Sequence, residues 1–264
     1  MSEDKDKWDD LWKNPEEMLY YTDVFRLMDE IKLEYLLAIL PPNKQNTKIV
    51  EVGCGPAWLS CALASEGYNT TCLDYSENAL NIARKNYEMQ GNKGEFIVGD
   101  ALNMAFEDNS FDVVLSTGLL EHFEDPSVVI NEMVRILKPG GIFYSDIVPK
   151  KFALFRAHID FVIGLNNLIK KEEDEIYEKK LNSNDIENIL ISSKLEDINV
   201  IPAGVFLPQI PYGRRIPTLK KIEYNFLSKI KRLFTVWDNT KIAEWCGFYY
   251  FCYAKKPSNE KNIH

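Results

Sequence analysis

Apolar side chains recur at helical spacing over residues 1–42, and two consecutive prolines then interrupt the pattern. The apolar positions fall largely on one face of a helix, at Leu27, Ile31, Tyr35, Ala38 and Ile39. Proline cannot continue a helix, because it lacks the backbone N–H and its ring clashes with the preceding turn. We therefore expect a helical N-terminal segment that ends at Pro41 and Pro42.

From residue 47 onward, short runs of β-branched and apolar residues alternate with helical patterns. The runs predict strands at residues 48–52, 69–74, 95–98, 111–116 and 141–147. The intervening patterns predict helices at residues 58–66, 76–90 and 126–137, and a turn at residues 138–141. Strands that alternate with helices at this spacing form βαβ units, so we expect a parallel sheet with right-handed crossovers.

The pattern is less regular after residue 150. Residues 150–194 read as helical, with Asn184 and Glu187 as a capping box, and strands are predicted at residues 198–206 and 245–254. We expect an α/β, Rossmann-like fold in which helices cover both faces of a seven-stranded, mostly parallel sheet. The N-terminal helices and a helical insertion near the C-terminus add to it, and the polar tail from Pro257 is expected to fray.

Composition and charge narrow the possible partners. The chain has 31 basic and 40 acidic residues, a formal net charge of −9, so no bulk attraction to nucleic acid is expected. The five cysteines form no CxxC pair and read as buried free thiols of a reducing compartment. The charged first ten residues do not resemble a signal peptide, and no apolar run is long enough to span a membrane. We therefore expect a cytoplasmic protein.

The first predicted strand ends in the turn Glu51-Val52-Gly53-Cys54-Gly55-Pro56-Ala57. Two glycines allow a sharp turn and a close approach of the backbone to a ligand, and the helix N-terminus that follows offers unpaired N–H groups. The dinucleotide fingerprint GxGxxG needs a small residue at position 58, but the bulky Trp58 is there. No GK[ST] sequence follows, so a P-loop is excluded as well.

Polar residues at the ends of the next strands complete a compatible set. Asp74 ends the second strand, where a carboxylate can accept hydrogen bonds from a ribose diol, and Tyr75 follows it. Asp100 and Ala101 follow the third strand, where a carboxylate can accept from an exocyclic adenine amine. Thr117 ends the fourth strand. Because ligands of open α/β sheets bind at the carboxyl ends of the strands, these positions point to one binding site.

Four sequence runs together resemble the class I methyltransferases, and are most similar to their small-molecule "type 11" branch. The runs are VEVGCGPAWLS, LDYSENALNIARKN, VGDALNMAFEDNSFDVVLSTGLLEHF and RILKPGGIFYSD, within residues 45–148. Ala57 departs from the commoner third glycine of this family.

The resemblance implies S-adenosylmethionine as cofactor and S-adenosylhomocysteine as product. By that resemblance, Glu51, Gly53 and Gly55 would surround the methionine moiety of the cofactor. Asp74 would hold the ribose hydroxyls with Tyr75 beside it, Asp100 and Ala101 would meet the adenine, and Thr117 would line the floor. The implied organisation is an N-terminal helical cap at 1–42, a cofactor-binding core at 43–149, an acceptor-side region at 150–256 and a tail at 257–264.

A general base is needed only if the methyl acceptor must lose a proton. His122, just past the fourth strand, is the candidate; alternatively it is a helix-start histidine that contacts cofactor or solvent. Glu121 reads as a solvated or hydrogen-bonded helix residue, and His158 as an ordinary histidine. Tyr144 and Asp146 end the fifth strand and could face the acceptor. Three scattered histidines form no metal-ligand set.

DNA base methylation is not expected, because the residues after the fourth strand read Ser116-Thr117-Gly118-Leu119 rather than the D/N-P-P-Y motif of enzymes that methylate exocyclic amines. Residues 1–25 are rich in aromatic side chains, including Trp8 and Trp12. They fit either helix–helix packing or a helix that closes over the cofactor, as N-terminal helices of the family often do.

Residues 207–240 combine apolar and basic positions. The apolar positions form a predicted helical stripe at Leu219, Ile222, Phe226, Ile230, Leu233 and Trp237. The basic residues lie off this stripe, at Arg214, Arg215, Lys220, Lys221, Lys229, Lys231 and Arg232. Such a helix can pack on the domain, cap an apolar or anionic substrate, or make a peripheral membrane contact through residues 218–237.

The sequence thus predicts an S-adenosylmethionine-dependent methyltransferase with a small-molecule or lipid-like acceptor. Two alternatives stay open: a nonenzymatic protein that binds the cofactor or its product, and a protein or RNA methyltransferase. The negative net charge counts against RNA, because phosphate binding needs concentrated positive charge. Acceptor specificity falls in residues 150–240, which carry no motif that names it.

Overall fold

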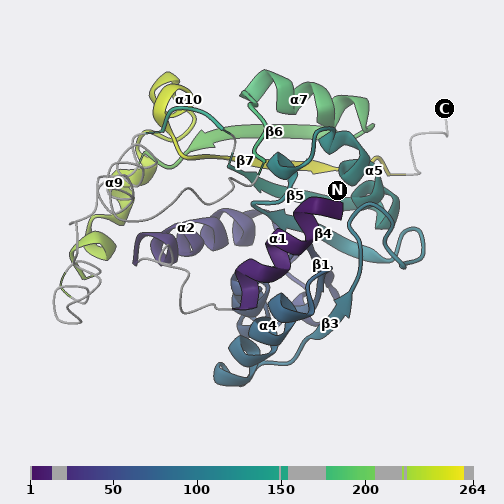
Figure 1. Cartoon of the computed structure of the whole chain (residues 1–264). Helices are drawn as coiled ribbons and strands as arrows, with labels where there is room; N and C mark the ends of the chain where they lie inside the picture. The colour runs from purple at the N-terminus through teal and green to yellow at the C-terminus, as the bar shows by residue number, and fades with distance from the viewer. Residues whose placement is uncertain are drawn as a thin grey trace.

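The computed structural model describes residues 2–13, 23–148, 150–153, 177–205, 222 and 225–258. A seven-stranded sheet crosses the molecule, with the strand order β3-β2-β1-β4-β5-β7-β6 (Figure 1). Strands β1 to β5 pair in parallel, whereas β7 runs antiparallel to both β5 and β6. The predicted Rossmann-like, mostly parallel sheet is therefore confirmed.

The strand bounds follow the predicted bounds closely in the first half of the sheet. The strands are β1 (Lys48–Val52), β2 (Asn69–Asp74), β3 (Glu95–Val98), β4 (Phe111–Thr117), β5 (Leu137–Ile147), β6 (Glu196–Ala203) and β7 (Tyr249–Lys255). β1 and β4 are neighbours near the centre of the sheet, and the chain adds strands outward in opposite directions from them, so the strand order reverses between β1 and β4. This is the point at which open α/β sheets bind ligands.

Helices cover both faces of the sheet. On one face lie α2 (Asp23–Ile39), α3 (Trp58–Ser65) and α4 (Glu77–Met89), and on the other lie α5 (Pro126–Ile136) and α7 (Ser183–Ser192). The short α9 (Lys231–Thr235) and α10 (Lys241–Cys246) lie together at one side of the molecule (Figure 1). Helix α1 (Ser2–Lys13) lies against α4, and the described part of residues 1–42 contains the helices α1 and α2 that the N-terminal helical segment predicted.

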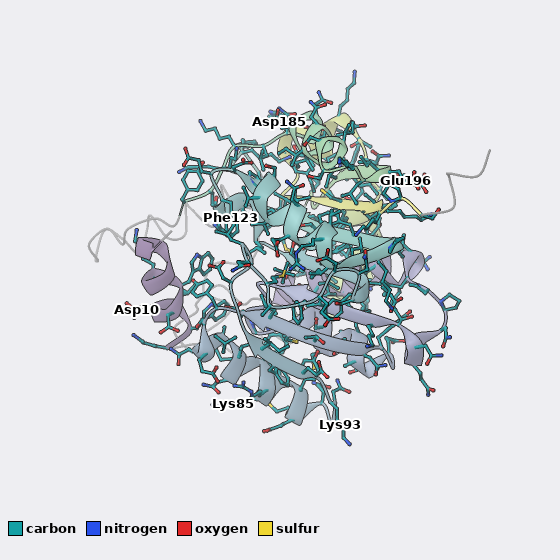
Figure 2. The ribbon with its side chains drawn as sticks, turned by 90° about the vertical axis from the view of Figure 1, so that its right-hand side faces the viewer. Asp10, Lys85, Lys93, Phe123, Asp185 and Glu196 are labelled. Carbon is teal, nitrogen blue, oxygen red and sulfur yellow. The ribbon has the colours of Figure 1, made fainter. Side chains whose placement is uncertain are left out.

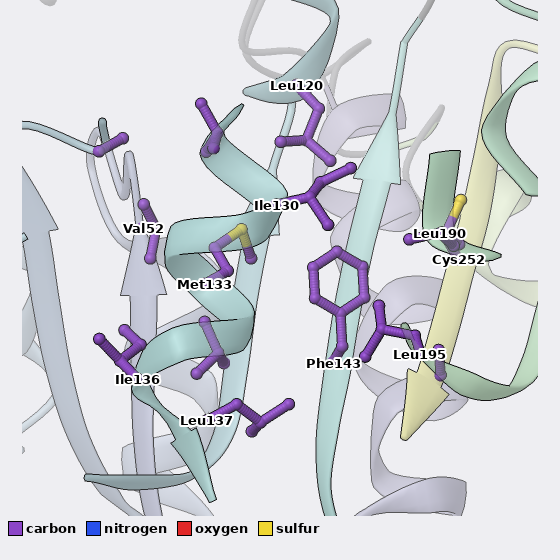
Figure 3. Packing of buried hydrophobic residues seen from close by; sticks show 14 of the residues in the cluster. Val52, Leu120, Ile130, Met133, Ile136, Leu137, Phe143, Leu190, Leu195 and Cys252 are labelled. Carbon is purple, nitrogen blue, oxygen red and sulfur yellow. The ribbon is translucent and has the colours of Figure 1, made fainter. Parts of the chain in front are cut away.

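The core beneath α5 shows how burial fixes this arrangement. Ile130, Met133 and Ile136 of α5 point toward the sheet, where they meet Val52 and Phe143 (Figure 3). All five side chains are at most 2% exposed. Burying one such side chain stabilises the fold by about 1.5–3 kcal/mol, so this stripe alone fixes α5 on the sheet.

Local capping explains where several helices begin. Ser76 caps α4 by accepting from the backbone N–H of Ala79, as its position before Glu77 predicts. The capping box of α7 was predicted two residues too late. It consists of Asn182 and Asp185, each of which accepts from the backbone N–H of the other.

Three strand predictions need correction. Residues 138–141, predicted as a turn, belong to β5, whose pairing with β4 shifts register before Val113. The sixth strand begins at Glu196 and ends at Ala203, instead of spanning 198–206. Trp245 and Cys246, predicted in the last strand, belong to α10, because the Thr240 side chain caps a helix there by accepting from Ala243.

Several predictions fall on residues outside the described part of the chain. They concern residues 154–176 of the segment 150–194 predicted as helical, His158, Arg214, Arg215, Leu219, Lys220, Lys221 and the end of the tail. In the same segment the described residues 150–153 and 177–182 are not helical, so the prediction is wrong there. Within the described ranges, no helix is long and apolar enough to cross a membrane. All five cysteines are buried and free, as predicted from their spacing.

Candidate functional site

The turn between β1 and α3 has the backbone conformation that its glycines permit. Gly53 and Gly55 have φ values of +66° and +49°, and Ala57 follows at φ 53°. The N–H groups of Gly53 and Cys54 both donate to the carbonyl of Leu73 at the end of β2, at 2.8 and 3.0 Å. A Cβ on Gly53 would lie 2.6 Å from Leu119 Cδ1, so a larger residue here requires a shift of the Leu119 side chain in addition to an unfavourable positive φ.

Asp74 ends β2 and connects this turn to the next one. Its Oδ2 accepts from the backbone N–H of Gly55 at 2.8 Å, and its Oδ1 accepts from that of Ser76 at 2.9 Å. Burial raises the pKa of the Asp74 carboxyl, and the two hydrogen bonds oppose that rise. The Tyr75 N–H also bonds to this carboxylate, and the acceptor capacity that remains beyond these three backbone groups is available to a hydroxyl group.

Glu51 lies beside Asp74 in the sheet, on β1, with 1% of its surface exposed. Its carboxylate accepts from the Ser60 N–H at 3.1 Å and from the Thr117 hydroxyl at 3.0 Å. Burial nevertheless raises the pKa of Glu51 to about 7, because the hydrogen bonds only partly replace the lost solvation. This buried carboxylate gains from any positive charge that comes close to it.

Tyr75, Asp100 and Ala101 border the same edge of the sheet on the β3 side. The N–H of Gly99 donates to the carbonyl of Asp74 at 2.9 Å, which holds the end of β3 next to that of β2. Asp100 is exposed and accepts from the Leu102 N–H at 2.9 Å, whereas Ala101 is buried. Tyr75 is half-buried. The eight predicted site residues therefore lie at the carboxyl ends of four adjacent strands, β3, β2, β1 and β4.

Helix α1 lies directly over these strand ends. The ring of Trp12 lies 3.0 Å from the position that a Cβ on Gly55 would take. Asp9 accepts from the Ser76 hydroxyl at 2.7 Å and from the Asn78 amide at 3.1 Å, both at the start of α4. Figure 2 shows α1, marked by Asp10, beside the body of the domain. The aromatic N-terminal segment thus packs on the predicted site.

His122 lies past β4, at the end of the short helix Leu120–His122, and its edge meets Trp8 of α1 at 4.8 Å between ring centroids. Its Nδ1 lies 2.8 Å from the carbonyl oxygen of Tyr177. Since a carbonyl can only accept, Nδ1 carries the proton, and in the neutral ring Nε2 keeps its lone pair. This arrangement leaves Nε2 able to accept a proton.

The sequence did not indicate a buried charge cluster on the β5 side. Lys32 of α2 forms an ion pair with Asp146, Nζ to Oδ2 at 2.8 Å, and the side chain of Asp146 is fully buried. Glu121 is 1% exposed, so the prediction that it is solvated is wrong. The alternative prediction, a hydrogen-bonded residue, is confirmed, because Glu121 accepts from the Val148 N–H at 3.0 Å. Burial raises the pKa of both carboxyls, although Lys32 opposes this at Asp146.

Part of this cluster has no hydrogen-bond partner among the described residues, namely Asp146 Oδ1, Glu121 Oε2 and the Tyr144 hydroxyl. Tyr144 and Asp146 lie two positions apart on β5 and so face the same side of the sheet. Period-two alternation places both on one face, but no sequence signal announces that Lys32, on a distant helix, meets them.

The site can therefore hold a ligand that carries both a vicinal diol and a positive charge. Asp74 offers acceptor oxygens for the diol. Glu51 offers negative charge in a buried setting, and so does Asp146, which lies next to Thr117 in the sheet. Buried carboxylates are costly unless they are paired, so a cationic ligand gains from them.

Residues 50–145 match the family model of a methyltransferase domain. The ubiquinone biosynthesis O-methyltransferase of Xanthomonas axonopodis is 31% identical over 142 residues, which are 52% of this chain and 59% of that protein. The chain thus spans less than two thirds of that relative. The structure of this chain is also similar to that of a Thermotoga maritima protein described as an S-adenosylmethionine-dependent, possible histamine N-methyltransferase.

That likeness has a TM-score of 0.59 at 20% identity and covers 94% of this chain and 99% of the other. The [4+2]-cyclase SpnF has the same fold at a TM-score of 0.54 and 18% identity, over 86% of this chain and 81% of its own. Likenesses at this level of identity establish the fold. They leave the reaction to be argued from the residues.

Proposed function

We propose that the protein transfers a methyl group from S-adenosylmethionine to a small-molecule or lipid-like acceptor, on the basis of the methyltransferase-domain match over residues 50–145 and of the sheet order. The observation that carries the proposal is the direct bonding of the site residues at adjacent strand ends, above all Asp74 to the glycine turn. The proposal concerns the whole protein's activity, whereas the domain match concerns its core.

Each site residue has a proposed role that its surroundings allow. Asp74 holds the ribose hydroxyls with Tyr75 beside it, because its oxygens retain acceptor capacity. Glu51, Gly53 and Gly55 surround the methionine moiety, whose ammonium and sulfonium charges suit a buried carboxylate. The adenine-side and floor roles fall to the remaining predicted residues, Asp100, Ala101 and Thr117.

When bound, S-adenosylmethionine supplies an electrophilic methyl group on a sulfonium sulfur. The chain's own residues position the acceptor in line with it and exclude water. For an acceptor that must lose a proton, His122 Nε2 is the proposed base, since the Tyr177 carbonyl fixes the proton on Nδ1. Glu121 anchors the Val148 backbone instead and is a positioning residue in this scheme.

The test of the base uses both residues. His122→Ala should lower kcat by about a hundredfold or more at unchanged cofactor affinity. His122→Ala with normal kcat on a phenolic or alcoholic acceptor would rule out the base role. Glu121→Gln keeps an oxygen for the Val148 N–H and should leave kcat within a few fold of wild type. A deeper loss of kcat would assign the role of general base to Glu121 instead of His122.

A quinone-like acceptor is one member of the proposed acceptor class, on the strength of the O-methyltransferase named above. The matched segment ends at residue 145 and does not include residues 150–240, where acceptor specificity is expected, so the class stays broad. The direct test measures release of S-adenosylhomocysteine with separate panels of phenolic lipids, hydrophilic phenols, amines, peptides and RNA. Turnover only with peptide or RNA would contradict the small-molecule assignment.

A second candidate is a protein that binds the cofactor without transferring its methyl group. The likeness to a [4+2]-cyclase favours keeping it, because the same fold carries a different named reaction there. The two candidates make different predictions: both bind S-adenosylmethionine, but only the methyltransferase consumes it. Binding without turnover across all five panels would favour the second.

A further inference from the structure

Large apolar side chains are exposed along residues 222–245, and we infer that this surface docks on an anionic lipid bilayer. We define the apolar face as the seven large hydrophobic residues that are more than two fifths exposed here, Ile222, Phe226, Leu233, Val236, Trp237, Ile242 and Trp245. Leu233 is 60% and Trp245 69% exposed. A soluble domain rarely leaves so many large apolar side chains close together, and such patches mark interaction sites.

The residues of the apolar face are not the ones that pack their segment onto the core. Leu227 and Phe234 are buried and Ile230 is half-buried, and these three residues join the core on the α2 side of the sheet. Of the predicted stripe, Ile230 therefore joins the core, whereas Ile222, Phe226, Leu233 and Trp237 are exposed and Leu219 lies outside the described residues. The segment has apolar residues on its inner and its outer side, so the fold alone does not account for the outer set.

The apolar face extends from α9 to α10 over a short connection. The N–H of Asn239 donates to the Pro202 carbonyl at 2.8 Å, which fastens the connection to β6. Figure 1 places α9 and α10 at the same side of the molecule. Trp245 also stacks on the exposed Phe152, 5.4 Å between ring centroids.

Phe152 follows the end of β5, so the apolar face adjoins the carboxyl edge of the sheet that carries the candidate site. Lys151 holds this junction, with Nζ 3.0 Å from the Tyr250 hydroxyl.

The charges around the apolar face are sorted by sign. Lys229, Arg232 and Lys241 are exposed and form no ion pair with any residue that the structure describes. The segment has three acids, and the two that the structure describes, Asp238 and Glu244, face inward. Asp238 accepts from the Tyr35 hydroxyl at 2.9 Å, and Glu244 accepts from the Tyr250 hydroxyl at 2.9 Å.

A chain with a net charge of −9 thus presents positive charge together with exposed tryptophans. An anionic bilayer fits both features. Basic residues attract its headgroups, and tryptophan rings prefer the boundary between headgroups and hydrocarbon. A second copy of this chain fits less well, because a symmetric contact through this face would bring the basic residues of both copies into one interface. The inference does not depend on methyl transfer.

The experiment is co-sedimentation of the full chain with vesicles of phosphatidylglycerol and phosphatidylcholine, compared with vesicles of phosphatidylcholine alone. We expect binding to the anionic vesicles at low salt and its loss at high salt. Trp237→Ser with Trp245→Ser should weaken binding more than tenfold. Arg232→Glu with Lys241→Glu should weaken it by about 25-fold or more, since each basic residue contributes about fivefold.

Matched controls separate this face from general exposure. Met89→Ser and Ile191→Ser change side chains that are 71% and 56% exposed on α4 and α7, away from the apolar face, and should leave binding unchanged. Circular dichroism checks the fold of every variant.

Three results would overturn the inference. The first is the absence of sedimentation with anionic vesicles at low salt. The second is an equal loss of binding in the control variants. The third is a wild-type dimer that the tryptophan variants convert to monomer, because a second copy would then cover the face.

Discussion

The carboxyl edge of β1, β2 and β4 differs from the apolar face of residues 222–245 in how its side chains are held and how far they are buried. At the edge, buried carboxylates are fixed by backbone N–H groups, as at Asp74 and Glu51. At the apolar face, large hydrophobic side chains project outward with no such anchoring, as Leu233 and Trp245 do. The first region is organised around a ligand of defined shape, and the second around a broad surface.

The difference teaches where specificity comes from in this molecule. A carboxylate held by two N–H groups has one orientation and can select a particular arrangement of hydroxyl groups. Exposed apolar and basic side chains select only a class of surface. The following predictions test that contrast, beginning with the largest expected effect.

The largest effect is expected at Asp74. Asp74→Asn replaces one acceptor oxygen by a donor, so it must give up the N–H of either Gly55 or Ser76, together with any ribose hydroxyl bound to that oxygen. We expect cofactor affinity to fall by about a hundredfold, roughly 3 kcal/mol, in a calorimetric titration. Asp100→Asn, which changes an exposed carboxylate at the same edge, should cost about tenfold at most. Equal small effects at both positions would remove the contrast.

Glu51 should make the stability of the ligand-free protein depend on pH. Its pKa rises from 4.5 to about 7 on folding, so the folded state binds a proton more tightly than the unfolded state. Stability from this group is then complete below pH 4.5 and is lost as the pH rises to 7. Over that window the loss amounts to about 3 kcal/mol.

The measurement compares wild type with Glu51→Gln by chemical denaturation at several pH values. Gln can accept from Ser60 and donate to Thr117, so the contacts of Glu51 survive without its charge. We expect the stability difference between the two proteins to move in favour of the variant by about 3 kcal/mol between acid and alkaline conditions. A constant difference would show that Glu51 ionises normally.

Gly53 tests whether the turn needs glycine for space. Gly53→Ala adds a Cβ 2.6 Å from Leu119 Cδ1 at a φ of +66°. Gly91→Ala is the matched control, with a φ of +68° and nothing within 4 Å. Backbone strain should cost each variant about 1–2 kcal/mol, and only Gly53→Ala should lose more.

Leu119→Ala in the Gly53→Ala background should recover the extra loss, which thermal or chemical unfolding measures directly. If Gly53→Ala and Gly91→Ala unfold alike, the close approach of Leu119 plays no part in the turn.

The smallest effect is expected on the apolar face. Leu233→Ala should change the free energy of unfolding by less than about 0.5 kcal/mol, because its side chain is 60% exposed. Leu190→Ala, at a side chain that is 1% exposed, should cost about 2–5 kcal/mol in the same denaturation assay. A core-sized loss at Leu233 would mean that the face is buried in solution.

The first half of the fold was predictable because its backbone constraints are local. β2, β3 and the Ser76 cap of α4 stand where the periodicity and the turn residues place them. The glycine turn could be read for the same reason, since positive φ angles restrict the residues that fit.

The remainder depended on contacts that are distant in sequence. Lys32 meets Asp146 only because α2 packs across the sheet, and nothing in the residues near either one signals the pair. The stripe predicted over residues 219–237 assumed one continuous helix, but among the described residues the helix is interrupted at Ile230 and Trp237 lies in a turn, so the stripe does not form a single buried face. Trp245 was placed in a strand because aromatic residues favour strands, yet the Thr240 cap started a helix there.

The most direct test of the account is a calorimetric titration of the protein with S-adenosylmethionine and S-adenosylhomocysteine, with NAD as the control ligand. The account predicts micromolar binding of the first two, none of NAD, and strong weakening by Asp74→Asn. Folded protein that binds neither sulfur compound, or that binds NAD equally well, would contradict the assignment of the carboxyl edge as a methyltransferase cofactor site.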